Sequence, residues 1–175
     1  MADGNTTTTT TTVGKLKRSA LLHYIDVSFG GSTPVWFLIG KHVEDLSIEL
    51  NPDMEIIKNI LDENAVNDNG YEPSTDVDTY YADPSDGEFY TKMKDIAMNR
   101  LTGDDCKTKI LEVLVDKTTG GYDAWTEDVM VKPQSYGGAQ GGVRIPYQVA
   151  FCGNRTKGTA TIANKTAPVF TPSNS

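Results

Sequence analysis

The two histidines, His23 and His42, carry the most versatile side-chain chemistry in this 175-residue chain, because imidazole binds metal ions and transfers protons near neutral pH. A metal site needs further ligands at suitable spacing, and neither histidine has a nearby cysteine or carboxylate placed that way. His23 alternates with apolar neighbours in a strand-like run, and His42 begins another. The pattern therefore favours packing or surface roles over a metal pair.

The two cysteines, Cys106 and Cys152, are poor candidates for nucleophiles. Cys106 directly follows Asp104 and Asp105, whose negative charges disfavour the reactive thiolate. Two cysteines are also too few for the disulfide framework of a small secreted domain. We expect free thiols of a cytosolic protein without a signal peptide, and no run of about 20 apolar residues predicts a membrane span.

Two further motifs resemble ligand sites without meeting their requirements. The pair Asp76 and Asp78 is a spacing that occurs often by chance, and the stretch 62–70 lacks the ligand order of a calcium loop. The glycines of 137–142 precede a strand-like run, whereas a phosphate-binding loop precedes a helix. The sequence predicts no catalytic residue, no metal site and no cofactor, so we expect a protein that is not an enzyme.

One amphipathic helix is predicted over residues 83–101. Its apolar residues recur with the 3.6-residue period of one helix face: Phe89, Met93, Ile96, Ala97 and Leu101. Asp83, followed by a proline, can cap the helix, and a capping box of Ser85 and Glu88 is an alternative start. Gly103 is placed to end it. We expect the apolar face to pack on a sheet.

The rest of the chain reads as short strands, typical of a β-sandwich or barrel with this single helix on its flank. The run 54–63 fits either a helix or a strand, and we interpret it as a strand leading into a long acidic hairpin through Asn67–Gly70 to Tyr81. The nearly continuous apolar run 109–115 predicts a central strand covered on both faces, and a Gly120-Gly121 turn follows it. The other predicted strands are 20–27, 35–39, 43–50, 125–131, 143–151 and 159–163.

Residues 143–151 show the clearest alternation, with Val143, Ile145 and Tyr147 on the same face. Pro146 lies on the other face and cannot donate to a strand ladder. This predicts a strand at a sheet edge, or a bulged one, that is available to a neighbouring molecule.

The charge is distributed unevenly along the chain. The net charge is −8, which argues against wrapping of nucleic acid. Residues 44–90 hold fourteen acids and one base, Lys58, so they carry −13 and the remainder carries +5. Opposite local fields can orient copies of one chain, although a solvated acidic loop region has the same composition.

Both ends of the chain are polar, which divides it into a threonine-rich arm (1–14), a β-domain (15–163) and a C-terminal arm (164–175). The first arm buries too little apolar surface to order by itself; it is disordered or orders against a neighbour. We expect the basic residues next to it to meet acids of an adjacent subunit. The candidate inter-subunit residues are Lys15, Lys17, Arg18, Asp62, Glu63, Asp68, Glu72, Asp76, Asp78, Val143, Ile145 and Tyr147.

Several ordered motifs resemble one protein family. They are Lys17–Tyr24, Trp36–Gly40, Val43 with Leu46 and Ser47, Asn51-Pro52, Lys107–Leu111 and Lys157–Ile162. Together they cover most of residues 15–163 and resemble the major tail protein, or tail tube protein, of long-tailed phages and prophages of Gram-positive bacteria. The threonine-rich start is not a feature of that resemblance.

The resemblance implies a β-sandwich-like subunit that closes into hexameric rings. The rings stack head to tail into a tube through which DNA leaves the capsid without specific binding. The implied partners are further copies of the chain and the tape measure, tail terminator and distal tail proteins. The implied location is the virion tail, after assembly in the host cytoplasm, and the family implies no catalytic residue and no cofactor.

Two other functions fit the same sequence features. An inner tube protein of a contractile tail or secretion-type apparatus shares the implied fold, and a sheath gene beside this one would favour it. A monomeric β-sandwich adhesion or carbohydrate-binding module would use Trp36 or Trp125 as a sugar platform.

Overall fold

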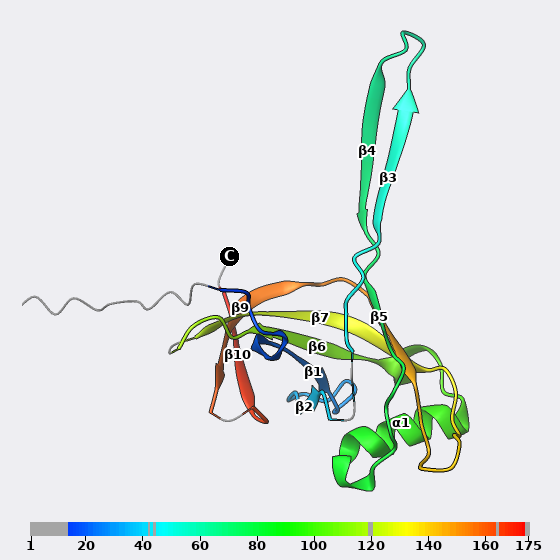
Figure 1. The fold of residues 1–175 in the computed structure, drawn as a ribbon, viewed down its shortest axis with the longest axis vertical. Helices are drawn as coiled ribbons and strands as arrows, with labels where there is room; N and C mark the ends of the chain where they lie inside the picture. The colour runs from blue at the N-terminus through cyan, green and yellow to red at the C-terminus, as the bar shows by residue number, and fades with distance from the viewer. Residues whose placement is uncertain (1–13, 42, 44, 119–120, 164, 174–175) are drawn as a thin grey trace, which may run out of the picture.

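The fold is built on one strongly curved antiparallel sheet. The structure, a computed structural model, describes residues 14–41, 43, 45–118, 121–163 and 165–173. The strand order in this sheet is β10-β9-β7-β6-β1-β2, and β8 extends it by pairing with β7 on one side and β5 on the other (Figure 1). The predicted mainly β class is confirmed. The strands are β1 (Leu21–Asp26), β2 (Trp36–Ile39), β5 (Ser74–Val77), β6 (Lys107–Leu114), β7 (Tyr122–Pro133), β8 (Tyr147–Phe151), β9 (Thr156–Ile162) and β10 (Pro168–Pro172).

Strand β6 lies at the centre of the sheet and is covered on both faces, as its apolar run predicts. Ile110 faces one core, while Leu111 and Val113 face a second core on the opposite side. All three side chains are buried. Alternate residues of one strand therefore stabilise two separate apolar layers.

The first core lies between the sheet and helix α1 (Glu88–Asn99), the one α-helix of the described residues. The helix buries Phe89, Met93, Ile96 and Ala97, so the predicted apolar face is confirmed. The Phe89 ring stacks on Phe37 of β2 with a centroid distance of 4.3 Å. It also meets the rings of Tyr80 and Tyr147 edge-on, at 5.0 and 5.8 Å.

The helix is shorter than the predicted range 83–101. Asp83 does act as a cap, because its carboxylate accepts a hydrogen bond from the Ser85 amide, but the turn it begins is a 3-10 turn over Pro84–Asp86. Gly87, with φ +63°, separates this turn from α1. At the other end the left-handed residue is Arg100 rather than the expected Gly103, which begins a second 3-10 turn (Gly103–Cys106).

The second core lies on the opposite face of the sheet and extends to β9 and to its neighbour β10. Phe170 packs against this core, and a side chain at Gly158 would overlap the Phe170 ring, at 2.6 Å. The buried Tyr24 hydroxyl donates to the Lys165 carbonyl at 2.9 Å and so attaches the β9–β10 connection to β1. Burial raises the pKa of Tyr24 to about 12, so its hydroxyl keeps the proton that it donates.

Two of the predicted strands, 43–50 and 143–151, differ from the structure. The described residues of the range 43–50 form no regular strand. Leu46 is buried, Leu50 is exposed, and among these described residues only Glu49 forms a bridge, to Ser74. Strand β8 begins after Pro146, and it is an internal strand because β5 and β7 both pair with it. Alternation identifies a buried face, but it does not report how many neighbours a strand has.

The C-terminal arm predicted over 164–175 contains a strand. Residues 168–172 form β10 and pair with β9 along its length. Pro168 and Pro172 fit there because β10 is an edge strand. Proline has no amide hydrogen to donate, and an edge strand has no neighbour on one side that needs one. The threonine run and Gly120 of the predicted turn lie outside the described residues.

Candidate assembly surfaces

A β-hairpin separate from the main sheet projects from the body of the molecule. Strands β3 (Pro52–Lys58) and β4 (Asn64–Tyr71) pair only with each other among the described strands, and Figure 1 shows them standing clear of the sheet. All seven residues of β3 are exposed. We name β3, β4 and the residues 59–63 between them the hairpin.

The hairpin carries seven of the fourteen large apolar side chains that are exposed in the described parts of the chain. In the ladder Ile56 pairs with Val66, and Ile57 pairs with Ala65, so both faces of the hairpin present apolar side chains to solvent. The seven are Met54, Ile56, Ile57, Ile60, Leu61, Val66 and Tyr71. Exposed apolar surface concentrated in one element is typical of an interaction site.

The tip of the hairpin is an ordered turn organised by Asn59. The Asn59 side-chain oxygen accepts hydrogen bonds from the amides of Leu61 and Glu63, at 2.9 and 3.0 Å. The Asn59 side-chain amide donates to the Glu63 carboxylate at 2.8 Å. Asp62 adopts φ +60° within this turn. Local bonds of this kind fix the backbone and leave Ile60 completely exposed at the end of the hairpin.

The turn thus lies at 59–63 rather than in the Asn67–Gly70 stretch of the predicted hairpin. Asp68 and Gly70 belong to β4, where the ladder shifts register opposite Asp53 and Met54. Gly70 has φ +95°, a conformation that side chains disfavour, and its amide donates to the Asp68 carboxylate at 2.9 Å. The asparagine-glycine signal marks a bulge near the base of the hairpin.

The structure separates the predicted acidic candidates into two groups. Asp62 and Glu63 lie at the hairpin tip, while Asp68 and Glu72 lie near its base. Asp76 and Asp78 instead border a cleft of about 300 Å³ on the body, where the structure adds two further acids, Asp45 and Glu49. Asp76 accepts a hydrogen bond from Gln134 at 2.8 Å.

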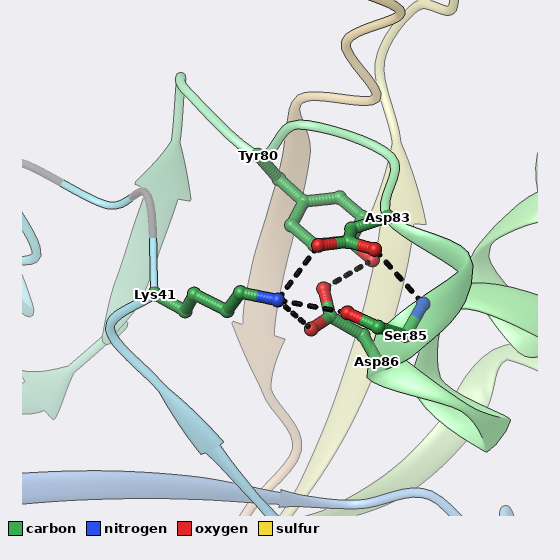
Figure 2. A network of polar contacts seen from close by, with 5 residues as sticks. All are labelled: Lys41, Tyr80, Asp83, Ser85 and Asp86. Atoms are coloured by element: carbon green, nitrogen blue, oxygen red, sulfur yellow. Dashed lines mark hydrogen bonds and ion pairs between the residues drawn. The ribbon is translucent and has the colours of Figure 1, made fainter.

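A polar network fixes the segment that leads from β2 to the hairpin (Figure 2). Lys41 donates to Asp83 at 2.7 Å, to Ser85 at 3.0 Å and to Asp86 at 3.2 Å. The hydrogen bond from Lys41 is the main reason that the pKa of Asp83 lies far below its usual value. Tyr80 donates to the second oxygen of Asp86 at 3.2 Å.

This network joins the β2 end to the 3-10 turn before α1, so the residues on both sides of the hairpin are held to the same part of the body. Nearer the hairpin, Glu49 and Ser74 exchange two backbone hydrogen bonds, at 2.9 and 3.0 Å, and β5 pairs with β8, so the base of the hairpin is attached to the sheet. The free part of the hairpin begins where Glu72 donates its amide to the Asn51 carbonyl, at 3.2 Å.

Of the basic candidates, Arg18 has defined contacts. Its guanidinium donates to the carbonyls of Leu21 and Leu46, at 2.6 and 2.9 Å, and so links the Leu46 backbone to the start of β1. Lys15 and Lys17 are exposed beside it. The three cations stay together at the surface next to the first strand, as the sequence predicts.

The three apolar inter-subunit candidates differ in their exposure to solvent. Val143 is exposed, but Ile145 and Tyr147 are buried in the first core of their own subunit. Their side chains are therefore not free to contact a neighbour, and the expectation that they do so is wrong. The alternation of 143–151 reported the subunit core.

The tryptophans do not form a shared sugar platform. The strand registers place Trp36 on the face of the second core and Trp125 on the opposite face. The Arg155 guanidinium lies 5.7 Å from the Trp125 ring centroid and donates to Glu127 at 2.8 Å and Glu112 at 2.5 Å. Trp125 and the two buried carboxylates form a structural cluster under Arg155.

The remaining chemistry is sparse. Within the described residues no group of three or more histidine, cysteine or acidic side chains is arranged to hold a metal ion. Cys106 is buried, with its thiol donating to the Leu101 carbonyl, and Cys152 is exposed. His42 lies outside the described residues. None of the described helices is long and apolar enough to cross a bilayer.

Comparison with known proteins finds likeness at the level of solved structures. No family model matches the chain, and no curated protein matches it in sequence. A solved cryo-EM structure, that of the sheath/tube terminator of the PVC extracellular contractile injection system in its extended state, superposes with a TM-score of 0.46 and 8% identity. The superposition covers 82% of this chain and 96% of the terminator. A likeness this distant carries no argument about function.

Sequence reasoning missed the two residues that define the hairpin tip, Asn59 and Ile60. An available signal was the position of Asn59 between an apolar strand and Asp62, because asparagine favours turns in which its side chain bonds the backbone two residues on. The exposure of Ile60 had no such signal, since an isoleucine next to a strand is ordinarily read as part of its buried face.

Proposed function

We propose that this chain is a structural protein that assembles with copies of itself into rings, which stack as the tail tube of a long-tailed phage or prophage. The hairpin is the observation that carries the proposal. It is ordered, it projects from a fixed base, and its apolar side chains have no partner surface within the described subunit.

Physical arguments support an external partner for the hairpin. An isolated two-stranded hairpin is only marginally stable in water, and this one buries almost none of its apolar side chains. A second surface supplies the missing burial, at roughly 25 cal/mol per Å² of apolar area. Because every subunit has one hairpin and one body, contact between unlike surfaces repeats from copy to copy and generates a ring or a filament.

The edges of the sheet support the same proposal. Strand β10 pairs only with β9, and β2 pairs only with β1, among the described strands. Each edge leaves a row of backbone amides and carbonyls that a neighbouring strand can pair with. Closure of a ring removes such edges, as closure does in a barrel.

The proposed ring has six subunits and the tube conducts DNA, both of which follow from the sequence resemblance. The acidic stretch 44–90 suits this role, because a negative wall repels phosphates and does not retain DNA in transit. The proposed partners are copies of the chain with the tape measure, tail terminator and distal tail proteins. The proposed location is the virion tail, after assembly in the host cytoplasm.

The test is assembly of the full-length purified chain, followed by light scattering and negative-stain microscopy as concentration rises. We expect sixfold rings and then tubes with a central bore. Ile56→Ser with Val66→Ser should prevent assembly, whereas Met98→Ser, which changes an exposed apolar residue of α1, should not. A strict monomer, even with tail initiator proteins supplied, would contradict the proposal, and a tube with a mainly basic lumen would contradict the role assigned to the acids.

A further inference from the structure

A groove on the body matches the hairpin tip in both polarity and charge. It has a volume of about 490 Å³ and is lined by residues at the start of β1, by residues of β2 and by Val43 and Leu46. Apolar side chains line it, including Leu21, Leu38, Val43 and Leu46. Its charged lining residues are both basic, Arg18 and Lys165. The hairpin tip has the reverse charge, with Ile60 and Leu61 followed at once by Asp62 and Glu63.

The structure explains why the groove keeps its shape. Arg18 joins the β1 start to the Leu46 carbonyl, and the Tyr24 hydroxyl holds the Lys165 carbonyl. Two walls of the groove are therefore fixed from opposite sides by hydrogen bonds. The hydrogen bonds of Asn59 pre-order the turn at the tip, and this lowers the conformational entropy that the turn loses on association.

The charge of the surroundings of the groove is also opposite to the charge of the hairpin. The segments 14–22 and 153–173 contribute three basic residues each and no acid, whereas 52–72 contains six acids and one base, a net charge of −5. Some of the basic charge is already neutralised, because Arg155 is paired with Glu112 and Glu127. Lys15, Lys17 and Lys165 are exposed and provide the field that attracts an acidic partner.

We propose that the groove between Arg18 and Lys165 receives the hairpin tip of a second copy of this chain, with Ile60 and Leu61 inserted and the adjacent acids facing the basic rim. The inference rests on the proposed self-assembly and specifies its contact. The hairpin points away from its own body (Figure 1), so the tip reaches a groove on another copy. Seven strand residues span about 23 Å at 3.3 Å per residue, which sets the reach of the contact.

The first experiment is disulfide trapping between two differently tagged full-length proteins, both carrying Cys152→Ser. One carries Leu61→Cys and the other Val43→Cys. Mixed and oxidised under assembly conditions, they should give a mixed disulfide, because a disulfide needs Cα atoms within about 7 Å. The matched control replaces Val43→Cys with Met98→Cys on the exposed side of α1. We expect at least about tenfold more trapping at Val43 than at Met98, which corresponds to about 1.4 kcal/mol of preference.

The second experiment reverses one charge at the groove and one charge at the hairpin tip. Lys165→Glu should raise the concentration needed for assembly about tenfold, and Glu63→Lys in the same chain should restore it by re-forming the opposite pair. Lys107→Glu is the control, because Lys107 begins β6, is exposed and does not line the groove. Its ion pair with the exposed Asp104, at 2.8 Å, is a surface pair whose loss costs little stability. Rescue distinguishes a direct contact from local damage to either element.

The outcomes separate this inference from the proposed function. Normal tubes with equal trapping at Val43 and Met98, or without rescue, would overturn the groove contact and leave the tube function standing. Trapping mainly between two Leu61→Cys copies would show a tip-to-tip contact instead and would overturn it as well. A wild-type protein that never assembles would overturn both.

Discussion

The body of this molecule buries its large apolar side chains, whereas the hairpin exposes them. In the body, β6 buries Ile110 on one face and Leu111 on the other, and α1 closes the first core with Phe89 and Met93. In the hairpin, every residue of β3 is exposed although the strand contains three large apolar side chains. The same residue types serve internal packing in one region and remain open to solvent in the other.

This difference separates the stability of the folded subunit from its ability to associate with other copies. Substitutions in the body are expected to change the free energy of unfolding, because packed apolar groups and paired charges are lost. Substitutions in the hairpin are expected to change association and leave folding almost intact. The four predictions below test this separation, in decreasing order of their expected effect on stability.

Met93→Asp is expected to unfold the subunit. Met93 is fully buried in the first core, and an unpaired carboxylate there should cost roughly 4 kcal/mol or more. Thermal melting followed by circular dichroism measures the loss. Met98→Asp is the control, because Met98 is half exposed on the same helix, and it should melt near the wild type. Equal effects of the two would show that the helix is not packed as described.

Acid should destabilise the body through His23. Burial, and to a smaller extent the nearby Arg18 charge, lowers the pKa of His23 from 6.5 to about 4. The unfolded chain binds this proton below about pH 6.5 and the folded chain only below about pH 4, so stability is complete above pH 6.5 and falls between the two values.

The full loss is about 3 kcal/mol, at 1.36 kcal/mol for each pKa unit. Denaturant titrations between pH 4 and 7 should show it, and the slope should be smaller in His23→Gln. A wild-type slope equal to that of the variant would show that His23 protonates freely in the folded state.

Arg155→Met should destabilise the body moderately. Glu112 and Glu127 are buried, and the substitution leaves both carboxylates without their shared cation. Because the Arg155 side chain is 44% exposed and water screens the interaction, we expect a loss of about 1–2 kcal/mol rather than the larger cost of a fully buried pair. Chemical denaturation gives the value. The triple variant that also carries Glu112→Gln and Glu127→Gln should recover part of it.

Ile56→Ser should have the smallest effect on folding, within about 0.5 kcal/mol, because the side chain is exposed in the free subunit. Its effect on assembly should be large, and the comparison of melting temperature with sedimentation of assembled tubes measures both. Loss of folding together with loss of assembly would mean that the hairpin contributes to the body.

The periodicity of apolar residues predicted which side chains of the body are buried, but it did not predict which strands pair with each other. The spacing of Phe89, Met93 and Ala97 identified the buried helix face, and the apolar run of β6 identified a strand covered twice. These patterns work because each side chain reports its own burial. They gave no indication that β8 pairs on both sides, since pairing is a property of the backbone and not of the side-chain pattern.

The hairpin was predicted as acidic and elongated, and its turn was misplaced. Asn67–Gly70 has the composition of a tight turn, but Gly70 is used for a bulge while Asn59 forms the turn through its side chain. A local sequence offers several turns, and register across the two strands decides between them. The exposure of Ile60 also had no sequence signal, because its burial depends on a surface that the single chain does not supply.

Lys58 gives the hairpin a further property, because it is the only lysine or arginine between Lys41 and Lys92. It ends β3 beside the exposed turn, where a protease that cleaves after lysine can reach the backbone. Cleavage there would split a free subunit at the hairpin while the body stays paired through its sheet. An assembled tube would hide the same bond, so the rate of a single proteolytic cut would report the fraction of subunits that have joined.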